Sequence, residues 1–330
     1  MRPSRSAALL LVVTALIYAP TLSYGYVFED LNDPTRFFQP VQSLSVMLTE
    51  ARYYPFRALT ALSYDLSKVI GSPVEPWGYH AVNVALHLLN SFLIYRLAAR
   101  VLSPWAAVGA LAIFALHPLQ VEAVAYISSR PDLVVTLCIL SALLAVEAQR
   151  WVLAALACGL ALLSKETGVV AVPLVGAWLL WRGAQWPSWR VLGASSAVGL
   201  GMVALLASKY ALSLDLTYAG GELIKAYAFL LRIPVPIWFS IDHHWVISPA
   251  LALAGLALAV VLALGALSRP RALWSLATVW VLICLSPRLA LPLVEGLHEH
   301  HLYAPMLGMS LLVGHLVTLG EPDGISQTFA

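Results

Sequence analysis

The sequence predicts an all-α integral membrane protein, a bundle of about ten transmembrane helices with a long, partly helical first outer loop. Its 330 residues are 60% hydrophobic and only 11% charged, against roughly 25% charged in soluble domains. Apolar runs recur along the whole chain. Of the 17 acidic residues, only Glu147, Glu321 and Asp323 are assigned to the cytoplasmic side. Because charge in or beside lipid is costly, this asymmetry predicts a reaction or binding site at the opposite face.

Ten apolar runs are assigned as membrane spans, because a helix needs roughly 20 residues to cross the bilayer core. They are residues 7–22, 78–99, 105–127, 132–148, 151–163, 168–182, 190–210, 248–268, 272–290 and 302–319. Two of the runs are short and could instead form one broken helix. The first run is expected to remain as an uncleaved span. Segment 221–240 is interrupted by charges and prolines, so it is expected to be interfacial or re-entrant, with a full span as the alternative.

This assignment makes residues 1–320 a single membrane domain, with outer loops at 23–77 and 211–247 and a short cytoplasmic tail at 321–330. Short loops rich in arginine give the orientation, since positive residues in such loops stay in the cytoplasm. We therefore expect a multi-pass protein with both termini in the cytoplasm. Its active face would lie in the periplasm of a bacterial inner membrane, or in a lumen. No basic stripe with interleaved aromatics occurs, so membrane lipids and not nucleic acid are the expected surroundings.

Three carboxylates follow the first span directly, in the segment Phe28-Glu29-Asp30-Leu31-Asn32-Asp33. A carboxylate in this place can accept a proton from a hydroxyl or bind a metal ion. The alternative is a solvated loop start, because Asn32, Asp33 and Pro34 favour a turn.

His80, Asn83, His87 and Asn90 repeat at helical spacing on the span after this loop, within an arc of about 80°. A polar stripe on a membrane helix faces protein or a cavity rather than lipid. Either hydrogen bonding between helices or the lining of a binding cavity explains the stripe.

The outer end of the next span carries His117-Pro118, Glu122 and Arg130, with Asp132 close behind. His117 and Glu122 lie too deep for casual surface residues, and Arg130 could present a planar donor fork to a phosphate. The alternative is an ion pair of Arg130 with Asp132 or Glu122 that only fixes helix packing.

The run from Trp151 to Leu163 rises only about 20 Å and cannot cross the whole bilayer core. Lys165 and Glu166, which follow it, are therefore expected in a recess below the outer surface that water can reach. The alternative is a lysine that snorkels to the interface.

The segment before the last span runs Glu295-Gly296-Leu297-His298-Glu299-His300-His301-Leu302-Tyr303-Ala304-Pro305. It is rich in histidine, but Leu302 stands where a helical zinc motif needs its second histidine, four residues after His298. We therefore assign no metal ligands and leave a divalent metal open as a cofactor.

Taken in chain order, these motifs resemble the membrane O-mannosyltransferases that carry tetratricopeptide repeats, and their bacterial relatives, in the C-type glycosyltransferase superfamily. The matching features are Phe28-Glu29-Asp30, Pro55-Phe56-Arg57-Ala58-Leu59, Ser63-Tyr64, His80, Asn83, His87, His117-Pro118, Glu122, Arg130, Ser164-Lys165-Glu166, Glu299 and Leu302-Tyr303-Ala304-Pro305. Together they span about residues 24–310.

The resemblance implies an outward-facing active site that transfers a hexose with inversion from a polyprenyl-phosphate donor, with mannose as the candidate sugar. The acceptor would be a hydroxyl of a protein or lipid. Asp30, with Glu29, matches the acidic pair that serves as base or metal ligand. The candidates for binding the donor phosphate are Arg130, Lys165, His300 and His301. The cavity lining is expected from His80, Asn83, His87, His117, Glu122, Glu166, Glu299 and Tyr303.

Three features depart from the family's usual pattern. Glu29 stands where the family usually has Asp, His300 stands where it has Arg, and no repeat of 20–50 residues occurs in this sequence. A neutral histidine is a weaker phosphate ligand than arginine near pH 7. Two rival hypotheses therefore stay open: a non-catalytic subunit of a larger membrane assembly, and a transporter or flippase of a lipid-linked substrate. A protein partner that replaces the repeat domain is also left open.

Overall fold

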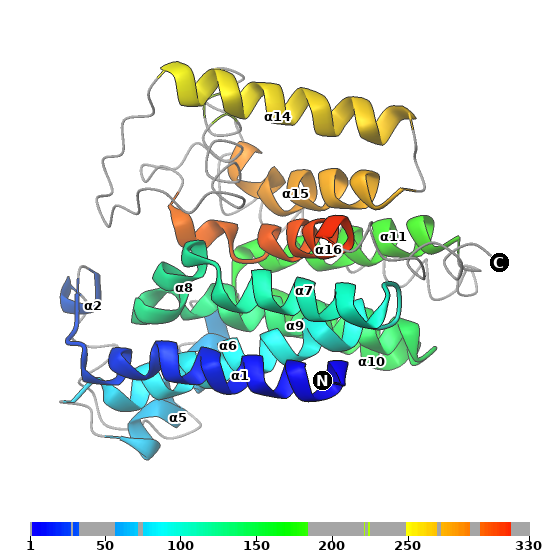
Figure 1. Cartoon of the computed structure of the whole chain (residues 1–330). Helices are drawn as coiled ribbons and strands as arrows, with labels where there is room; N and C mark the ends of the chain where they lie inside the picture. The colour runs from blue at the N-terminus through cyan, green and yellow to red at the C-terminus, as the bar shows by residue number, and fades with distance from the viewer. Residues whose placement is uncertain are drawn as a thin grey trace.

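The computed structural model of the chain is a bundle of helices that lie side by side, as Figure 1 shows. It describes residues 2–27, 29–32, 57–71, 75–183, 221, 224, 249–268, 272–290 and 298–317. Within these ranges every regular element is helical. The predicted all-α class is therefore confirmed.

Three helical stretches are long and apolar enough to cross a membrane. The first joins α1 (Pro3–Tyr18) to a 3₁₀ turn, η1 (Ala19–Ser23), the second is α6 (Trp77–Ala98), and the third joins η4 (Ile127–Ser129) to α9 (Arg130–Glu147). A fourth is reached only if the bent pair of α7 (Pro104–Leu116) and the helix after it is one span. By this measure the described residues contain three or four candidate spans, and the predicted number of ten is not confirmed.

The predicted unbroken span 105–127 is wrong, because the helix breaks at His117. α7 ends at Leu116, and the chain continues through η3 (Pro118–Gln120) into α8 (Val121–Ala125) at an angle of 51°. Pro118 lacks an N–H and disfavours helical geometry in the residue before it. His117 accordingly has extended backbone angles, φ −68° and ψ 130°. The break brings α8 and η4 to the end of the bundle where α2 (Glu29–Asn32) lies (Figure 1).

The other predicted spans correspond to shorter helices or lie outside the described residues. Residues 151–163 and 168–182 contain α10 (Trp151–Leu162), the 3₁₀ turn η5 (Glu166–Val170) and α11 (Ala171–Arg182). The C-terminal part has α14 (Pro249–Ser268), α15 (Leu273–Ala290), η6 (Glu299–Leu302) and α16 (Pro305–Val317). The predicted span 190–210 and the tail 321–330 lie outside the described residues, as does segment 221–240 apart from Gly221 and Ile224. The first outer loop holds α2 and α5 (Ala58–Ile70), in keeping with a partly helical loop.

The core forms around α9, which lies between α6 and α10 and also contacts α11. Its Leu133, Leu140 and Leu143 are fully buried in the same apolar cluster as Phe114 of α7 and Trp280 of α15. Many large apolar side chains are instead exposed on the outside of the bundle, among them Leu9, Val12 and Leu16 on α1 and Val152 and Leu156 on α10. Monomeric soluble proteins rarely expose apolar surface so extensively. These side chains are suited to contact lipid.

Candidate active site

Asp30 lies in α2, a single helical turn that the chain reaches soon after η1. Its side chain is fully buried. Oδ1 accepts hydrogen bonds from the backbone N–H of Ser128 at 3.1 Å and from the Ser128 hydroxyl at 2.6 Å, and the N–H of Val27 donates to Oδ2 at 3.4 Å. These donors attach Asp30 to η4, the turn between α8 and α9. Glu29 begins the same helical turn, and its side chain lies outside the described part of the chain.

Tyr26 lies beside this carboxylate. Burial raises the pKa of Tyr26 to about 12, and the negative charge of Asp30 adds to the shift. The Tyr26 ring also packs edge-on against Tyr79 of α6, with the ring centres 6.1 Å apart. With its pKa raised, the phenol stays protonated near neutral pH and can donate a hydrogen bond next to Asp30.

Glu122 of α8 holds the histidine-rich segment in place. Its Oε2 accepts a hydrogen bond from the backbone N–H of His300 at 3.0 Å, and its Oε1 lies 2.8 Å from Nδ1 of the same histidine. A carboxylate can only accept, so His300 carries a proton on Nδ1. The rings of His298 and His301 pack against His300, with centres 5.5 Å and 3.9 Å away. The predicted residues Glu122, His300 and His301 thus form one cluster.

His301 differs from His300 in its hydrogen bonding. Its Nδ1 accepts a hydrogen bond from the backbone N–H of His298 at 3.0 Å. Because an imidazolium has no acceptor nitrogen, His301 is neutral while this bond is present. Glu299 begins η6 and is partly buried.

Arg130, the first residue of α9, is fully buried. Its Nε donates to Asn83 Oδ1 at 2.7 Å, Nη1 donates to the Ser63 carbonyl at 2.7 Å and to the Ser67 hydroxyl at 2.8 Å, and Nη2 donates to the Tyr79 carbonyl at 2.8 Å. The guanidinium also lies over the ring of Tyr64, 4.4 Å from its centre. These partners, all uncharged, join α5, α6 and α9. Neither of the ion pairs considered from the sequence forms, since Asp132 and Glu122 bind other partners.

The polar stripe on α6 serves mainly to connect helices. His87 is fully buried, with Nδ1 2.8 Å from the Tyr303 hydroxyl and Nε2 3.0 Å from the Ala115 carbonyl. The carbonyl requires a proton on Nε2, so the Tyr303 hydroxyl donates to Nδ1 when His87 is neutral. Asn90 donates to the Tyr303 hydroxyl at 3.2 Å and to the Leu133 carbonyl at 2.9 Å. Of the two explanations of the stripe, hydrogen bonding between helices accounts for Asn83, His87 and Asn90.

The two remaining predicted histidines, His80 and His117, each lie near the end of a helix. His80 is buried at the start of α6, where its ring lies edge-on to Tyr24, 6.3 Å between centres. His117 caps η3, because its Nδ1 accepts a hydrogen bond from the backbone N–H of Leu119 at 3.1 Å.

Two ion pairs lie where α10 meets α5 and α9. Nζ of Lys165 contacts both carboxylate oxygens of Asp132, at 2.9 and 2.8 Å. Arg57 donates from Nε and Nη2 to Glu166 at 3.4 and 3.0 Å. Burial alone would raise the pKa of the Glu166 carboxyl, but the charge and hydrogen bond of Arg57 lower it overall. The Lys165 and Glu166 side chains are 12% and 20% exposed, and the recess that the sequence predicts around them stays a prediction.

The segment that runs through η4 into the first turn of α9 connects these groups. Ser128, which binds Asp30, precedes Arg130 by two residues, and Asp132, which binds Lys165, follows Arg130 by two. On the other side of Ser128, the Tyr126 ring lies edge-on to His300 at 6.3 Å. The Asp30 site and the histidine cluster therefore lie on neighbouring parts of the segment that joins α8 to α9.

Sequence reasoning missed the residues that position this site. Ser128 was not singled out from the sequence, and Arg57 was included only among the features that match the family. Asp132 was considered only as an alternative ion-pair partner of Arg130, and nothing in the sequence indicated that it would pair with Lys165, 33 positions away. Among the described residues no three His, Cys, Asp or Glu side chains are arranged to hold a metal ion.

Residues 59–208 match the family model described as dolichyl-phosphate-mannose-protein mannosyltransferase. The segment includes Glu122, Arg130 and Lys165, but not Asp30 or His300. The resemblance to the C-type glycosyltransferase superfamily is confirmed.

Curated relatives agree with this family. The chain is 36% identical over 138 residues to the protein O-mannosyl-transferase Tmtc2 of Drosophila melanogaster, covering 38% of this chain and 15% of that protein. It is 32% identical over 182 residues to Tmtc1 of the same species, and 26% identical over 190 residues to TMTC3 of Mus musculus. These matches cover 49% and 51% of this chain and 21% and 20% of the two relatives. The chain thus spans about a fifth of the length of these relatives. No solved structure matches it.

Proposed function

We propose that this protein transfers a sugar, with mannose as the first candidate, from a polyprenyl-phosphate donor to an acceptor hydroxyl at the non-cytosolic face of a membrane. The observation that carries the proposal is the position of Asp30. In a chain similar to mannosyltransferases, this carboxylate is attached through Ser128 to the segment that leads into Arg130. The acceptor, a protein or a lipid, would approach from the outer end of the bundle.

In the proposed reaction the acceptor oxygen attacks the anomeric carbon of the donor sugar. The bond from that carbon to the phosphate oxygen breaks as the new glycosidic bond forms on the opposite face, so the configuration inverts. Asp30 takes the proton of the attacking hydroxyl, a step that is typically worth about 10²–10⁴ in rate. The leaving polyprenyl phosphate takes up negative charge, which cations in a low-dielectric site stabilise more strongly than they would in water.

The contacts divide the proposed phosphate ligands into two groups. Arg130 donates hydrogen bonds to Asn83, Ser63, Ser67 and Tyr79. Its proposed role is therefore to hold α5, α6 and α9 together around the site. Lys165 is partly exposed and stays a proposed ligand. His300 donates its Nδ1 proton to Glu122, whereas His301, whose Nδ1 accepts a hydrogen bond, carries its proton on Nε2 and is the better suited of the two to donate to an anion. We also propose a divalent metal beside Asp30. Assays of activity with and without a chelator test this.

The test is transfer of radiolabelled mannose from a polyprenyl-phosphate donor by the full chain in proteoliposomes, with Asp30→Asn compared with Asp65→Asn. Asparagine keeps an oxygen for the hydrogen bonds of Ser128 but cannot take the proton. We expect Asp30→Asn to lose about 10²–10⁴ in rate while the protein stays folded, with a thermal midpoint lowered only by loss of the long Val27 hydrogen bond. Asp65, which pairs with Lys68 on α5, serves as the matched control and should retain activity. Full activity of Asp30→Asn would remove Asp30 from the mechanism.

The complete burial of Asp30 favours a second candidate function, that of a non-catalytic subunit in a larger membrane assembly. A catalytic base must contact its substrate. A carboxylate whose role is only to attach α2 to η4 can be fully buried. In that case wild-type protein would transfer no mannose, and it would copurify from its native membrane with a partner protein. Transfer by the wild-type chain alone would exclude this candidate.

A further inference from the structure

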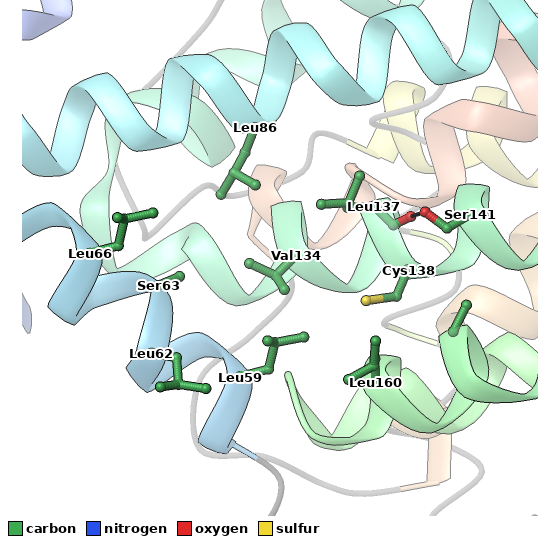
Figure 2. Close-up of a pocket in the computed structure, with 11 residues that line it drawn as sticks. Leu59, Leu62, Ser63, Leu66, Leu86, Val134, Leu137, Cys138, Ser141 and Leu160 are labelled. Carbon is green, nitrogen blue, oxygen red and sulfur yellow. Dashed lines mark hydrogen bonds between the residues drawn. The ribbon is translucent and has the colours of Figure 1, made fainter. Parts of the chain in front are cut away.

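An apolar cavity of about 410 Å³ lies between α5, α6, α9 and α10, and Asp30 is not among the residues that line it. Figure 2 shows its lining side chains directed toward one common space. They are Leu59, Leu62, Ser63, Leu66, Leu86, Val134, Leu137, Cys138, Ser141, Ala157 and Leu160. None of them is charged. The volume falls within the range of about 300–1,000 Å³ that is usual for small-molecule sites.

The cavity opens sideways onto the apolar surface of the bundle. Leu62 and Leu66 of α5 and Leu160 of α10 line it, yet they are 47%, 53% and 44% exposed. Next to them on α5, Val69 and Ile70 are also exposed. Exposed leucines at the rim of a cavity are unfavourable in contact with water but favourable in contact with lipid chains. A hydrocarbon chain in the membrane can therefore enter between α5 and α10 without crossing water.

One end of the cavity adjoins charged groups. The backbone N–H of Leu59 donates to the Leu163 carbonyl at 2.8 Å, and the Thr60 hydroxyl donates to the Ser164 carbonyl at 2.7 Å. These bonds bring the start of α5 against the residues that precede Lys165. Arg57 does not line the cavity itself, but it precedes the lining residue Leu59 by two positions and pairs with Glu166, which follows Lys165, so it adjoins this end of the cavity.

The Arg57 side chain is 34% exposed, and Glu166 orients its guanidinium through Nε and Nη2. Nη1 has no hydrogen bond with another described residue. A planar guanidinium held on one edge by a carboxylate can offer its remaining donors to a phosphate oxygen. The site therefore combines a hydrocarbon cavity with an oriented cation at one end, which complements an amphiphile that carries a single anionic head.

We infer that the cavity and Arg57 together bind the polyisoprenyl phosphate, with the first isoprene units between α5, α9 and α10 and the phosphate at Arg57. The identity of the lipid rests on the proposed function. The inference adds a residue to the donor site, since Arg57 was not among the expected phosphate ligands. It also assigns Glu166 a positioning role, because Glu166 holds Arg57 rather than contacting the phosphate.

The primary test maps lipid binding on wild-type protein, without any sugar transfer. The probe is a polyisoprenyl phosphate with a diazirine in its first isoprene units, activated by light in proteoliposomes. We expect adducts on cavity residues such as Leu62, Leu137 and Cys138, suppressed by unlabelled polyisoprenyl phosphate but not by phosphatidylcholine. Adducts confined to other surfaces would overturn the inference. So would equal labelling of the cavity by a diazirine phosphatidylcholine, which would identify an ordinary lipid groove.

Two variants on α10 provide a matched pair. Ala157 lines the cavity and is buried, whereas Ala155 on the same helix is exposed and does not line it. We expect Ala157→Phe to fill the cavity and lose most of the labelling, and Ala155→Phe to retain it. Equal labelling of the two variants would overturn the inference. The wild-type adduct map stands independently if Ala157→Phe fails to fold.

A second pair separates phosphate binding from helix docking. Arg57→Gln should lower labelling about tenfold or more, the loss expected for one charge-assisted hydrogen bond. Glu166→Gln breaks the same ion pair but keeps the cation, so it should label more strongly than Arg57→Gln. If the Arg57–Glu166 ion pair only docks α5, both variants will lose labelling equally. That result would contradict phosphate binding by Arg57. Cavity labelling by a wild-type chain that transfers no sugar would instead contradict the proposed function.

Discussion

At the scale of single residues, Arg130 shows how a buried charge can organise a membrane protein. Taking an ion out of water is costly unless hydrogen bonds compensate it. Four hydrogen bonds and the Tyr64 ring surround the guanidinium, and its acceptors come from two other helices. A lysine could not reach these acceptors with one nitrogen, so the site depends on the geometry of arginine as well as on its charge.

The first prediction follows from this geometry. Arg130→Lys should lose at least one hydrogen bond to a charged group, a cost of about 1.5–3 kcal/mol in the free energy of unfolding. Thermal unfolding in detergent measures the loss, with Arg100→Lys on an exposed part of the chain as the control. If Arg130→Lys is as stable as wild type but binds the donor lipid poorly, Arg130 contacts the phosphate after all and its structural role is wrong.

Sequence reasoning reached the polar residues but not their partners. Helical spacing placed Asn83, His87 and Asn90 on one face of a helix, and that face is indeed buried. Spacing cannot show that Tyr303, more than 200 positions later, supplies the hydroxyl for His87 and Asn90. Such contacts depend on how the helices pack, which local periodicity does not determine.

At the scale of helices, α7 and α16 pack at unusually short range because glycines face each other. A Cβ atom on Gly314 would lie 2.6 Å from the Ala106 carbonyl oxygen and 2.6 Å from the Ala110 nitrogen, and Gly109 approaches the Gly314 backbone from the opposite helix. Small residues allow membrane helices this approach, since close backbone packing drives their association. The contact sets the position of α16, which begins two residues after Tyr303.

The second prediction is that Gly314→Ala forces α7 and α16 apart. Overpacking of this kind costs about 1–3 kcal/mol, and it should also weaken the contact of His87 with Tyr303. Gly159→Ala is the matched control, because a Cβ atom there meets nothing within 4 Å and alanine favours a helix by about 1 kcal/mol. Thermal unfolding of the two variants tests this, and we expect the lower midpoint for Gly314→Ala. Equal midpoints would show that α7 and α16 move apart without loss of stability.

The broken helix at His117 shows another limit of reading helices from sequence. Apolar content alone made residues 105–127 look like one span, although Pro118 was visible. A proline inside a membrane helix can be tolerated when neighbours satisfy the freed backbone groups, so its presence did not decide between a kink and a break. The structure has a break, and the break places Glu122 where it binds His300.

At the scale of the whole molecule, polar groups gather at one end of the bundle. Asp30 lies in α2 and Glu122 in α8, two helices that Figure 1 shows at the same end of the bundle. Lys165 forms an ion pair with Asp132 in the first turn of α9. Glu147 ends α9 at the opposite end, where its carboxylate accepts hydrogen bonds from Trp178 and Arg182. Among the residues that the structure describes, the carboxylates of the candidate site thus lie at the end of α9 opposite to Glu147. The arginine-rich short loops predict that the Glu147 end faces the cytoplasm.

The last prediction tests that orientation directly. Leu31 lies on α2 at the proposed outer end and is 60% exposed. Arg100 follows α6 at the proposed inner end and is also exposed. Each is replaced by cysteine. With Cys138, Cys158 and Cys284 replaced by alanine, a membrane-impermeant maleimide should label Leu31→Cys in intact spheroplasts. It should label Arg100→Cys only after the membrane is permeabilised. The reverse pattern would place Asp30 and the histidine cluster in the cytoplasm, where the acceptor and the lipid-linked donor would both have to approach from the other leaflet.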